Sequence, residues 1–216
     1  MKIAKGSKSW ILSAFIPGLF FMILYLIFNN LVFGSVVLLF SAALLLLTVF
    51  FLMFFRDPDR QIGKGIVVCA DGKIREIKKI KDKEIGDCIK ISTFMNVQNV
   101  HVNRTPIDGV IRDVAHKKGA HLPAFKKESE RNERVILTID SNIGIVRVVQ
   151  IAGTLARRIV PYVKKGDKLK KGEKIGIIRL GSRVDVYLPS EKIKRACVKV
   201  GDRVKAGEDR LAEIND

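Results

Sequence analysis

The first 55 residues of this 216-residue chain contain no aspartate or glutamate, and their only charged side chains are Lys2, Lys5 and Lys8. The other 161 residues hold the remaining 36 Lys and Arg against all 22 Asp and Glu, a net charge of +14. This split excludes a fully soluble chain. The regular spacing of Val and Ile after residue 55 also excludes a disordered polycation, because 161 such residues can bury a core.

Cysteine and histidine are scarce, with three of each. The cysteines, Cys69, Cys88 and Cys197, are odd in number and far apart, which argues against a disulfide framework and a zinc site. No spacing of His, Cys and Asp predicts any other metal site. The phosphate-binding loop, the dinucleotide fingerprint and the Gly-x-Ser-x-Gly elbow are missing as well. These absences argue against nucleotide-binding enzymes and serine hydrolases.

Two long apolar runs are present at the N-terminus. Residues 10–28 are apolar except for Ser13 and the pair Pro17-Gly18, and residues 31–55 contain no charge. A spanning helix needs about 20 residues. Residues 1–55 are therefore predicted to form a membrane anchor of two transmembrane helices that turn at Asn29-Asn30. The alternative is one spanning helix after a re-entrant or interfacial segment, because Pro17-Gly18 weakens the first run.

The charged flanks of this anchor predict its orientation. Three lysines precede the first run, and Arg56 and Arg60 follow the second. Because positive flanks stay in the cytoplasm, residues 56–216 are predicted to be a cytoplasmic domain at the cell membrane. Each Lys or Arg near an anionic lipid surface contributes about 1 kcal/mol of attraction. A lipid partner is favoured over nucleic acid, because neither a helix-turn-helix pattern nor an aromatic-basic platform is present.

The domain after residue 55 has the pattern of a β protein. Short apolar runs, several with period-two alternation, are separated by Gly, Asp and Lys, which are hairpin and meander signals. Apart from a short helix predicted near residues 122–130, no stretch keeps a helical period. The fold class predicted is mostly β, a compact β-sandwich or barrel behind the helical hairpin. The expected strands are 65–70, 73–77, 88–92, 110–114, 135–139 and 145–151.

Two short segments recur within this domain. Asp71–Arg75 is repeated as Asp108–Arg112, and Gly166–Glu173 is repeated as Gly201–Glu208. Two copies are too few for a solenoid, and they fit a compact sandwich in which similar corners recur. The second pair resembles the turn of lipoyl and biotinyl domains. The Met-Lys hairpin that carries the modified lysine of those domains has no counterpart, so a carrier function is not predicted.

Residue types alone give few candidates for chemistry. Alternation around residue 101 places His101 on one face with Asn99 and Asn103, away from its valine neighbours. The other two histidines, His116 and His121, lie in a Lys/Gly-rich stretch predicted to be a loop. Gly181-Ser182 separates two strand-like runs, 174–178 and 183–188. These patterns alone do not assign a catalytic role to any of these residues.

Six short motifs follow one another along the chain. They are Phe54-Phe-Arg-Asp-Pro-Asp-Arg60, Ala70-Asp71-Gly72, Phe94-Met95, Val100-His-Val-Asn-Arg104, Arg131-Asn-Glu-Arg134 and Leu180-Gly-Ser-Arg-Val-Asp185. This ordered set resembles the short, archaeal and bacterial form of phosphatidylserine decarboxylase, a family that includes the archaetidylserine decarboxylases, and the resemblance covers the chain from Lys8 to Ile214. Two features depart from the family pattern: the N-terminal motif lacks its trailing proline, and Gly-Ser-Arg replaces the Gly-Ser-Thr of the longer forms.

The resemblance implies a lyase that makes its own pyruvoyl group by self-cleavage between Gly181 and Ser182. The Ser182 hydroxyl would attack the Gly181 carbonyl to form an ester, and elimination and hydrolysis would leave a pyruvoyl group on Ser182. The products would be a β chain of residues 1–181 and an α chain of residues 182–216. The resemblance implies no metal and no pyridoxal phosphate.

The resemblance also implies site residues. A maturation triad would consist of Asp71, His101 and Ser182, with His101 as the base and Asp71 as its orienting partner. Longer family members have a second histidine where this chain has Arg104, so His101 would serve both maturation and decarboxylation. Three arginines, Arg104, Arg131 and Arg134, are candidates to hold the substrate's phosphate or carboxylate. A structural role in ion pairs is an equal alternative for each of them.

The predicted function is pyruvoyl-dependent decarboxylation of a serine phospholipid, archaetidylserine or phosphatidylserine, to the ethanolamine phospholipid. The pyruvoyl carbonyl would form an imine with the serine amine and accept the electrons left by CO2. One alternative is a non-enzymatic, membrane-anchored adaptor with a lipoyl-like domain, and another is a tethered nucleic-acid binder. The residues are consistent with both ester acyl and ether isoprenoid tails, and the resemblance implies at most a homodimer.

Overall fold

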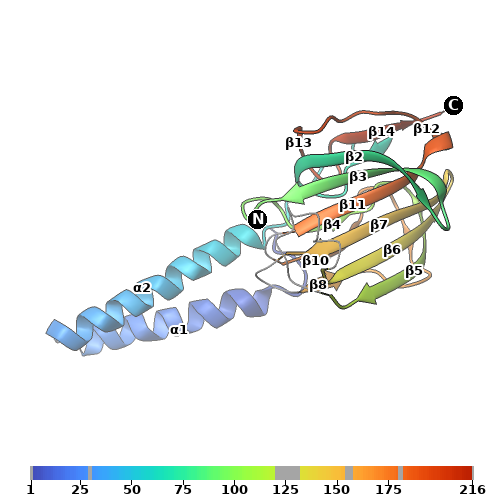
Figure 1. Cartoon of the computed structure of the whole chain (residues 1–216). Coiled ribbons are helices and arrows are strands. Elements are labelled where there is room, and N and C mark those ends of the chain that lie inside the picture. Colours follow the sequence, from blue (N-terminus) through green and yellow to red (C-terminus); the bar gives the residue numbers. More distant parts are fainter. Residues whose placement is uncertain (1, 29–30, 120–131, 154–157, 180–181, 216) are drawn as a thin grey trace. The chain divides into compact units, whose positions relative to one another are not determined.

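The computed structural model describes the whole chain except residues 1, 29–30, 120–131, 154–157, 180–181 and 216. It divides into two compact units, Met1–Asp59 and Arg60–Asp216. The first unit is helical, and the second is built almost entirely from strands (Figure 1). The predicted fold class, mostly β with two apolar N-terminal helices, is confirmed. The helix expected near residues 122–130 and His121 lie outside the described residues.

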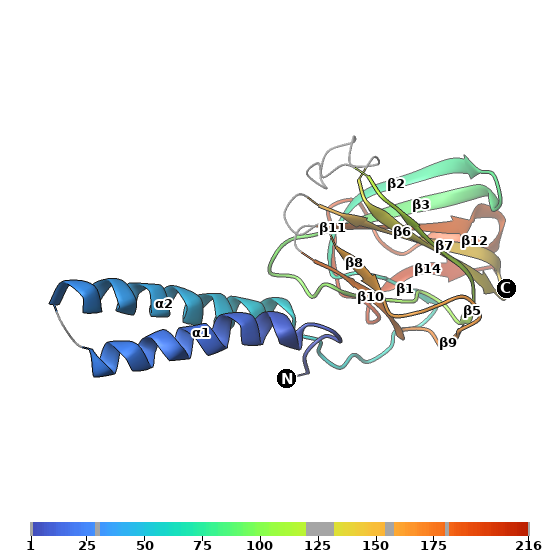
Figure 2. The same cartoon turned by 90° about the horizontal axis from the view of Figure 1, so that it is seen from below.

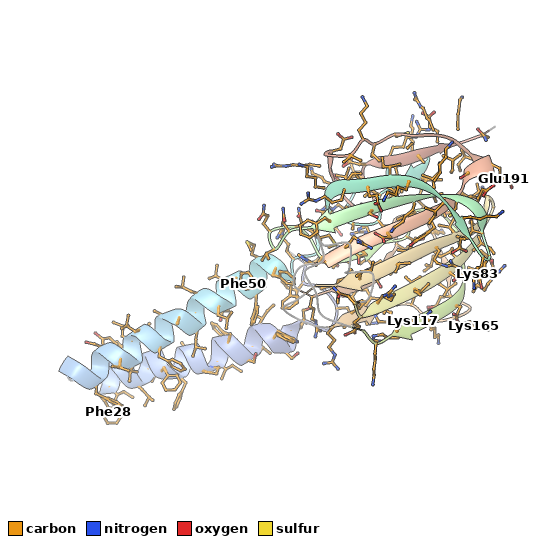
Figure 3. All side chains as sticks on the ribbon, in the orientation of Figure 1. Phe28, Phe50, Lys83, Lys117, Lys165 and Glu191 are labelled. Carbon is orange, nitrogen blue, oxygen red and sulfur yellow. The ribbon has the colours of Figure 1, made fainter. Side chains whose placement is uncertain are left out.

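The first unit contains helices α1 (Lys8–Ile27) and α2 (Leu31–Phe54), each long and apolar enough to cross a membrane. Pro17 lies inside α1 without ending it, so the first apolar run forms a full-length helix. Gly18 allows α1 to pack closely on α2, because a Cβ atom at this position would lie 3.1 Å from the Leu45 side chain. The carbonyl oxygen of Gly18 accepts a 2.8 Å hydrogen bond from Ser41 Oγ. Large apolar side chains project outward from both helices (Figure 3), which suits lipid better than water.

The second unit is organised around one antiparallel eight-stranded sheet in the order β13-β2-β3-β11-β7-β6-β5-β9. The sheet is strongly curled (Figures 1 and 2). Its central position is held by β11, which pairs with β3 on one side and β7 on the other. The strands are β2 (Gly72–Asp82), β3 (Gly86–Met95), β5 (Gly109–Lys117), β6 (Arg134–Ser141), β7 (Gly144–Ala152), β9 (Lys168–Leu169), β11 (Ser182–Pro189) and β13 (Arg203–Val204).

Two three-stranded antiparallel sheets, β1-β14-β12 and β4-β10-β8, complete the unit. Their buried side chains join those of one face of the main sheet in a single core cluster, so the core lies between the three sheets. A 3-10 helix, Ser190–Lys192, follows β11. The strands are β1 (Ile66–Val67), β4 (Val102–Arg104), β8 (Ile159–Pro161), β10 (Lys174–Ile178), β12 (Ile193–Ala196) and β14 (Arg210–Ile214).

Alternation along β11 separates the two faces of the main sheet. Val184, Val186 and Leu188 belong to the core cluster. Successive side chains of a strand point to opposite faces, so Arg183 and Asp185 lie on the other face. Both of these charged residues are nevertheless buried, at 9% and 1% exposure. The face opposite the core therefore holds buried charge.

The segments repeated in the sequence form two equivalent corners of the fold. In the first corner, Gly166–Glu173, the leading amide donates a 2.8 Å hydrogen bond to the carbonyl oxygen of Ile111. In the second corner, Gly201–Glu208, the leading amide donates a 2.9 Å bond to Ile74. Each corner therefore docks on the strand that begins at one of the two repeated Asp-Gly turns, and the two sequence repeats are parts of one structural repeat.

Candidate functional site

Ser182 is the first residue of β11 and is fully buried. It is paired with Met95 of β3 and with Ala152 of β7. Its Oγ donates a 3.4 Å hydrogen bond to the Sδ atom of Met95. A thioether sulfur is a weak acceptor, so this contact orients the hydroxyl without holding it strongly. Gly181, the predicted cleavage partner, lies outside the described residues.

His101 lies just before β4 and is fully buried. Its Nδ1 atom is 2.9 Å from the carbonyl oxygen of Asn99. A carbonyl oxygen can only accept a hydrogen bond, so Nδ1 carries the proton and, in the neutral ring, Nε2 carries the lone pair. The histidine is thus in the tautomer whose Nε2 can act as a base.

The backbone brings His101 and Ser182 to the same end of the domain. The carbonyl oxygen of His101 accepts a 3.3 Å hydrogen bond from the amide of Ile178, the last residue of β10. Ile178 precedes Ser182 by four residues, a distance that an extended chain spans in at most about 14 Å. The two predicted site residues, 81 positions apart in the sequence, therefore lie in the same part of the fold.

A buried polar chain, which the sequence pattern did not reveal, leads to Met95. Gln150 Nε2 donates a 2.8 Å hydrogen bond to Asn103 Oδ1, and Asn103 Nδ2 donates a 3.7 Å bond to the same sulfur atom that Ser182 contacts. Both amides are fully buried. The available signal was Gln150, the one uncharged polar side chain in strand β7. Among the residues that the structure describes, no group of His, Cys, Asp or Glu could hold a metal ion.

Asp71 lies at the second corner of the repeat. Its Oδ1 accepts a 2.8 Å hydrogen bond from the amide of Ala206, and its Oδ2 is 2.8 Å from Arg60 Nη2. Neither of these bonds joins Asp71 to His101. The equivalent aspartate of the first corner, Asp108, accepts a 2.6 Å bond from the backbone in the same way. The contact with Ala206 is therefore a feature of the repeated corner, to which Asp71 adds an ion pair with Arg60.

The three arginines predicted to bind substrate have different surroundings. Arg104, at the end of β4, is buried and donates a 2.8 Å hydrogen bond from Nη1 to the carbonyl oxygen of Gly172. This contact ties Arg104 to the first corner. Arg134 begins β6, and its Nε donates a 3.2 Å bond to the carbonyl oxygen of Asn132. Arg131 lies outside the described residues.

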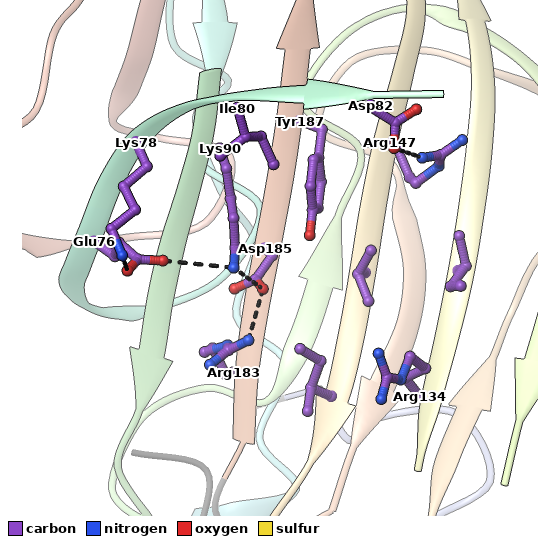
Figure 4. A pocket seen from close by; sticks show the side chains of 13 residues that line it. Glu76, Lys78, Ile80, Asp82, Lys90, Arg134, Arg147, Arg183, Asp185 and Tyr187 are labelled. Carbon is purple, nitrogen blue, oxygen red and sulfur yellow. Dashed lines mark hydrogen bonds and ion pairs between the residues drawn. The ribbon is translucent and has the colours of Figure 1, made fainter. Parts of the chain in front are cut away.

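A pocket of about 530 Å3 lies on the face of the main sheet opposite the core (Figure 4). Its lining contains five cationic and three anionic side chains, a net charge of +2, around an apolar floor. Sequence reasoning missed this site, although the alternation of charged and apolar residues in β11 was its signal. The lining consists of Glu76, Lys78, Ile80, Asp82, Lys90, Arg134, Ile136, Arg147, Val149, Ile151, Arg183, Asp185 and Tyr187.

Ion pairs organise one wall of this pocket. Asp185, which is 1% exposed, lies 2.9 Å from Arg183 Nη2 and 3.5 Å from Lys90 Nζ. Lys90 also reaches Glu76 at 3.5 Å, so the network crosses from β11 through β3 to β2. A hydrogen bond from Lys78, reinforced by the charge of Lys90, lowers the pKa of Glu76. The wall therefore favours the charged form of Glu76.

Comparison with known proteins gives one consistent family. Residues 47–212 match the sequence model of the phosphatidylserine decarboxylase family. The chain is 46% identical to a protein of Methanococcoides burtonii that has been assigned the name archaetidylserine decarboxylase proenzyme. This match covers 98% of the chain and 96% of the relative. It is 52% identical, over 73% of its length and 70% of the relative's, to the phosphatidylserine decarboxylase proenzyme of Thermobifida fusca.

Proposed function

The chain belongs to the phosphatidylserine decarboxylase family, whose members are carboxy-lyases, and from this premise we propose that it decarboxylates a serine phospholipid with a pyruvoyl group made from Ser182. The observation that carries the proposal is Ser182 itself, a buried serine that begins the central strand of the sheet. The word proenzyme in the names of the relatives supports a precursor that matures.

The proposed maturation uses only the chain and water. Ser182 Oγ attacks the carbonyl carbon of Gly181, the peptide C–N bond breaks, and an ester forms. Loss of the Ser182 Hα proton then breaks the Cβ–Oγ bond, which releases the new carboxylate of Gly181 and leaves dehydroalanine. Addition of one water and loss of one ammonia give the pyruvoyl group. Glycine suits position 181, because its carbonyl is not shielded by a side chain.

We assign His101 the role of base in both proton removals, since its Nε2 carries the lone pair in the neutral tautomer. The orienting role that the resemblance implies for Asp71 stays a prediction, since the carbonyl oxygen of Asn99 accepts the Nδ1 hydrogen bond of His101 and Asp71 contacts Ala206 and Arg60. Arg134 is the better supported of the predicted substrate-binding arginines, because it lines the pocket. The pyruvoyl group would supply the electron sink for decarboxylation, and His101 would protonate the product.

The two apolar helices suggest association with a membrane. We propose the cytoplasmic membrane, with the β domain in the cytoplasm, because both flanks of the helical pair are basic. After cleavage the α chain would stay bound, since its strand β11 is paired with β3 and β7 of the β chain. The resemblance implies a homodimer at most, and this stays a prediction, which light scattering of the detergent-solubilised protein checks.

Denaturing electrophoresis of the full chain, purified from membranes, tests the proposal. We expect two fragments, residues 1–181 and 182–216, of which the smaller carries a carbonyl that reacts with hydroxylamine. Ser182→Ala should leave the chain intact. Ser92→Ala, which changes another buried serine on the adjacent strand β3, should not affect cleavage. A single band without a reactive carbonyl from the unmutated protein would contradict the proposal and favour the non-enzymatic adaptor.

The substrate is tested by CO2 release from purified serine phospholipids. Phosphatidylserine and archaetidylserine, presented in matched mixed micelles, differ in tail chemistry and share the headgroup. We expect CO2 and the ethanolamine lipid from at least one of them, and none from the Ser182→Ala protein. The ratio of kcat/KM for the two lipids then identifies the preferred tails. Absence of CO2 from both lipids by fully cleaved protein would refute the proposed reaction.

A further inference from the structure

We propose that Arg183 and Arg134 together bind the phosphodiester of the lipid substrate at the end of the pocket beside Ser182. This inference rests on the proposed function and adds to it the site of the substrate's phosphate. It gives a role to Arg183, the residue that follows Ser182. It also explains why a charged pocket lies along β11, the strand that carries the reacting group, on the face of the sheet opposite the core.

Strand register places the two arginines in one row. Arg183 of β11 is paired with Ile151 of β7, and Arg134 of β6 is paired with the same isoleucine from the other side. All three residues line the pocket, so they share its face of the sheet. Two strand spacings of about 4.8 Å each separate the arginine backbones. Figure 4 shows both arginines at the same end of the pocket. Their long side chains can therefore reach a common anion above Ile151.

This row lies next to the reacting position. The pyruvoyl carbonyl would derive from the Cα atom of Ser182, a backbone atom in the plane of the sheet and directly before Arg183 in the chain. In a serine phosphodiester, four bonds of about 1.5 Å each join the phosphorus to the amine nitrogen. The phosphate must therefore lie within about 6 Å of that nitrogen. The Cα atom of Arg183 is only about 3.8 Å from that of Ser182, so this arginine is within reach of the phosphate.

The charges of the pocket favour an anionic ligand. Glu76 pairs with Lys78 and Lys90, Asp82 pairs with Arg147, and Asp185 pairs with Arg183 and Lys90. The five cations outnumber the three acids, and this net charge of +2 attracts a phosphodiester.

The same network prepares Arg183 for binding. Asp185 contacts its Nη2 at 2.9 Å and thereby fixes the guanidinium on the pocket side of β11. Lys90, at 3.5 Å from the carboxylate, offsets the charge of Asp185. Arginine is the preferred residue for phosphate because its planar guanidinium can donate two parallel hydrogen bonds. Limited solvent access strengthens such charge interactions.

The kinetic test compares two amphiphilic serine substrates, one with a phosphate and one without. One is a short-chain serine phospholipid, and the other is an O-acylserine amphiphile with the same amine and carboxylate but no phosphate. Arg183→Gln and Arg134→Gln should each lower kcat/KM for the phospholipid about 10- to 100-fold, the effect of one hydrogen bond to a charged group, mainly through KM. Turnover of the O-acylserine should be unchanged. Arg112→Gln, which changes an exposed arginine outside the pocket lining, is the control and should affect neither substrate.

A binding measurement separates this inference from the proposed function. The full-length Ser182→Ala precursor, in nanodiscs, is titrated with glycerophosphoserine, and the added Arg183→Gln or Arg134→Gln change should weaken binding about 10-fold or more. Equal kinetic losses on both substrates, or unchanged affinity in the precursor, would overturn the inference. Failure of the unmutated protein to cleave or to release CO2 would instead count against the proposed function. If Arg183→Gln does not mature, Arg134→Gln carries the kinetic test, since residue 134 is far from the cut in the sequence.

Discussion

Replacing Arg60 by glutamine should destabilise the β domain strongly, because Arg60 joins two acids from distant parts of it. Arg60 Nη2 lies 2.8 Å from Asp71 Oδ2, and Nη1 lies 3.1 Å from Glu208 Oε1. The side chains of Arg60 and Asp71 are only 7% and 10% exposed. Glutamine leaves the carboxylate of Asp71 buried without its cation. The change therefore acts on a desolvated charge rather than on a surface contact.

The size of the effect follows from this burial. Removal of one partner of a buried ion pair costs about 3–5 kcal/mol of unfolding free energy. A domain of this size loses roughly 2–4 °C of Tm for each kcal/mol, so Tm should fall by about 6–20 °C. The matched control is Arg112→Gln, since Arg112 pairs with Asp140 at side-chain exposures of 50% and 44%. An exposed pair contributes at most about 1 kcal/mol, so the control should lower Tm by no more than about 4 °C.

The assay is thermal unfolding of the full chain in detergent micelles, followed by the β-sheet circular dichroism signal. Both variants are made in the Ser182→Ala background, so that every sample is an intact chain and differences in cleavage do not enter. Equal shifts of Tm in Arg60→Gln and Arg112→Gln would refute the reasoning, because the buried pair would then be energetically equivalent to an exposed one.

Three further outcomes follow from the same structure. Gly72→Ala should cost about 1–3 kcal/mol of stability, because an added Cβ would lie 2.1 Å from a carbonyl oxygen of β3; urea unfolding measures the loss, and an unchanged free energy of unfolding would contradict the packing argument. Ellman's reagent should titrate one thiol in the native protein, Cys197, because the other two cysteines are buried, and a second fast-reacting thiol would contradict that burial. The hydrogen bond from Lys78 lowers the pKa of Glu76 in the folded state, so the stabilisation by Glu76 is full above its unfolded pKa of about 4.3 and is lost as pH falls through the lower folded value. Glu76→Gln should therefore make Tm fall less steeply with decreasing pH in this acid range. An unaltered dependence of Tm on pH would exclude the contribution of Glu76.

The sequence was sufficient for features that depend on local pattern. Uncharged length predicted both apolar helices, and α1 continues through Pro17, the position on which the alternative depended. Short apolar runs and alternation predicted the long strands of the main sheet, whereas β4, β8, β9, β12, β13 and β14 were not among the expected strands. The repeats anticipated the two equivalent corners. Ser182, His101 and Asp71 were singled out through family resemblance, because nothing in their local patterns distinguishes them from ordinary strand and turn residues.

Contacts between distant segments could not be predicted in this way. Gln150 and Asn103 are 47 residues apart, and their hydrogen bond depends on which strands become neighbours. The row of Arg183, Ile151 and Arg134 requires the register of three strands, which no single segment encodes. Polar residues at such positions are visible in the sequence as exceptions to alternation, but their partners are set by topology.

If the chain is cut before Ser182, only one of the two equivalent corners stays on the same chain as the strand on which it docks. The first corner and the strand on which it docks both stay in the β chain. The second corner, Gly201–Glu208, passes to the α chain, while its partner Ile74 stays in the β chain. In the cleaved protein the first corner is thus a contact within one chain, and the second corner, with the same local structure, is a contact between two chains. Fragment complementation, with a synthetic peptide of residues 182–216 added to a separately refolded β chain, would measure directly how strongly one half of the repeat holds the other.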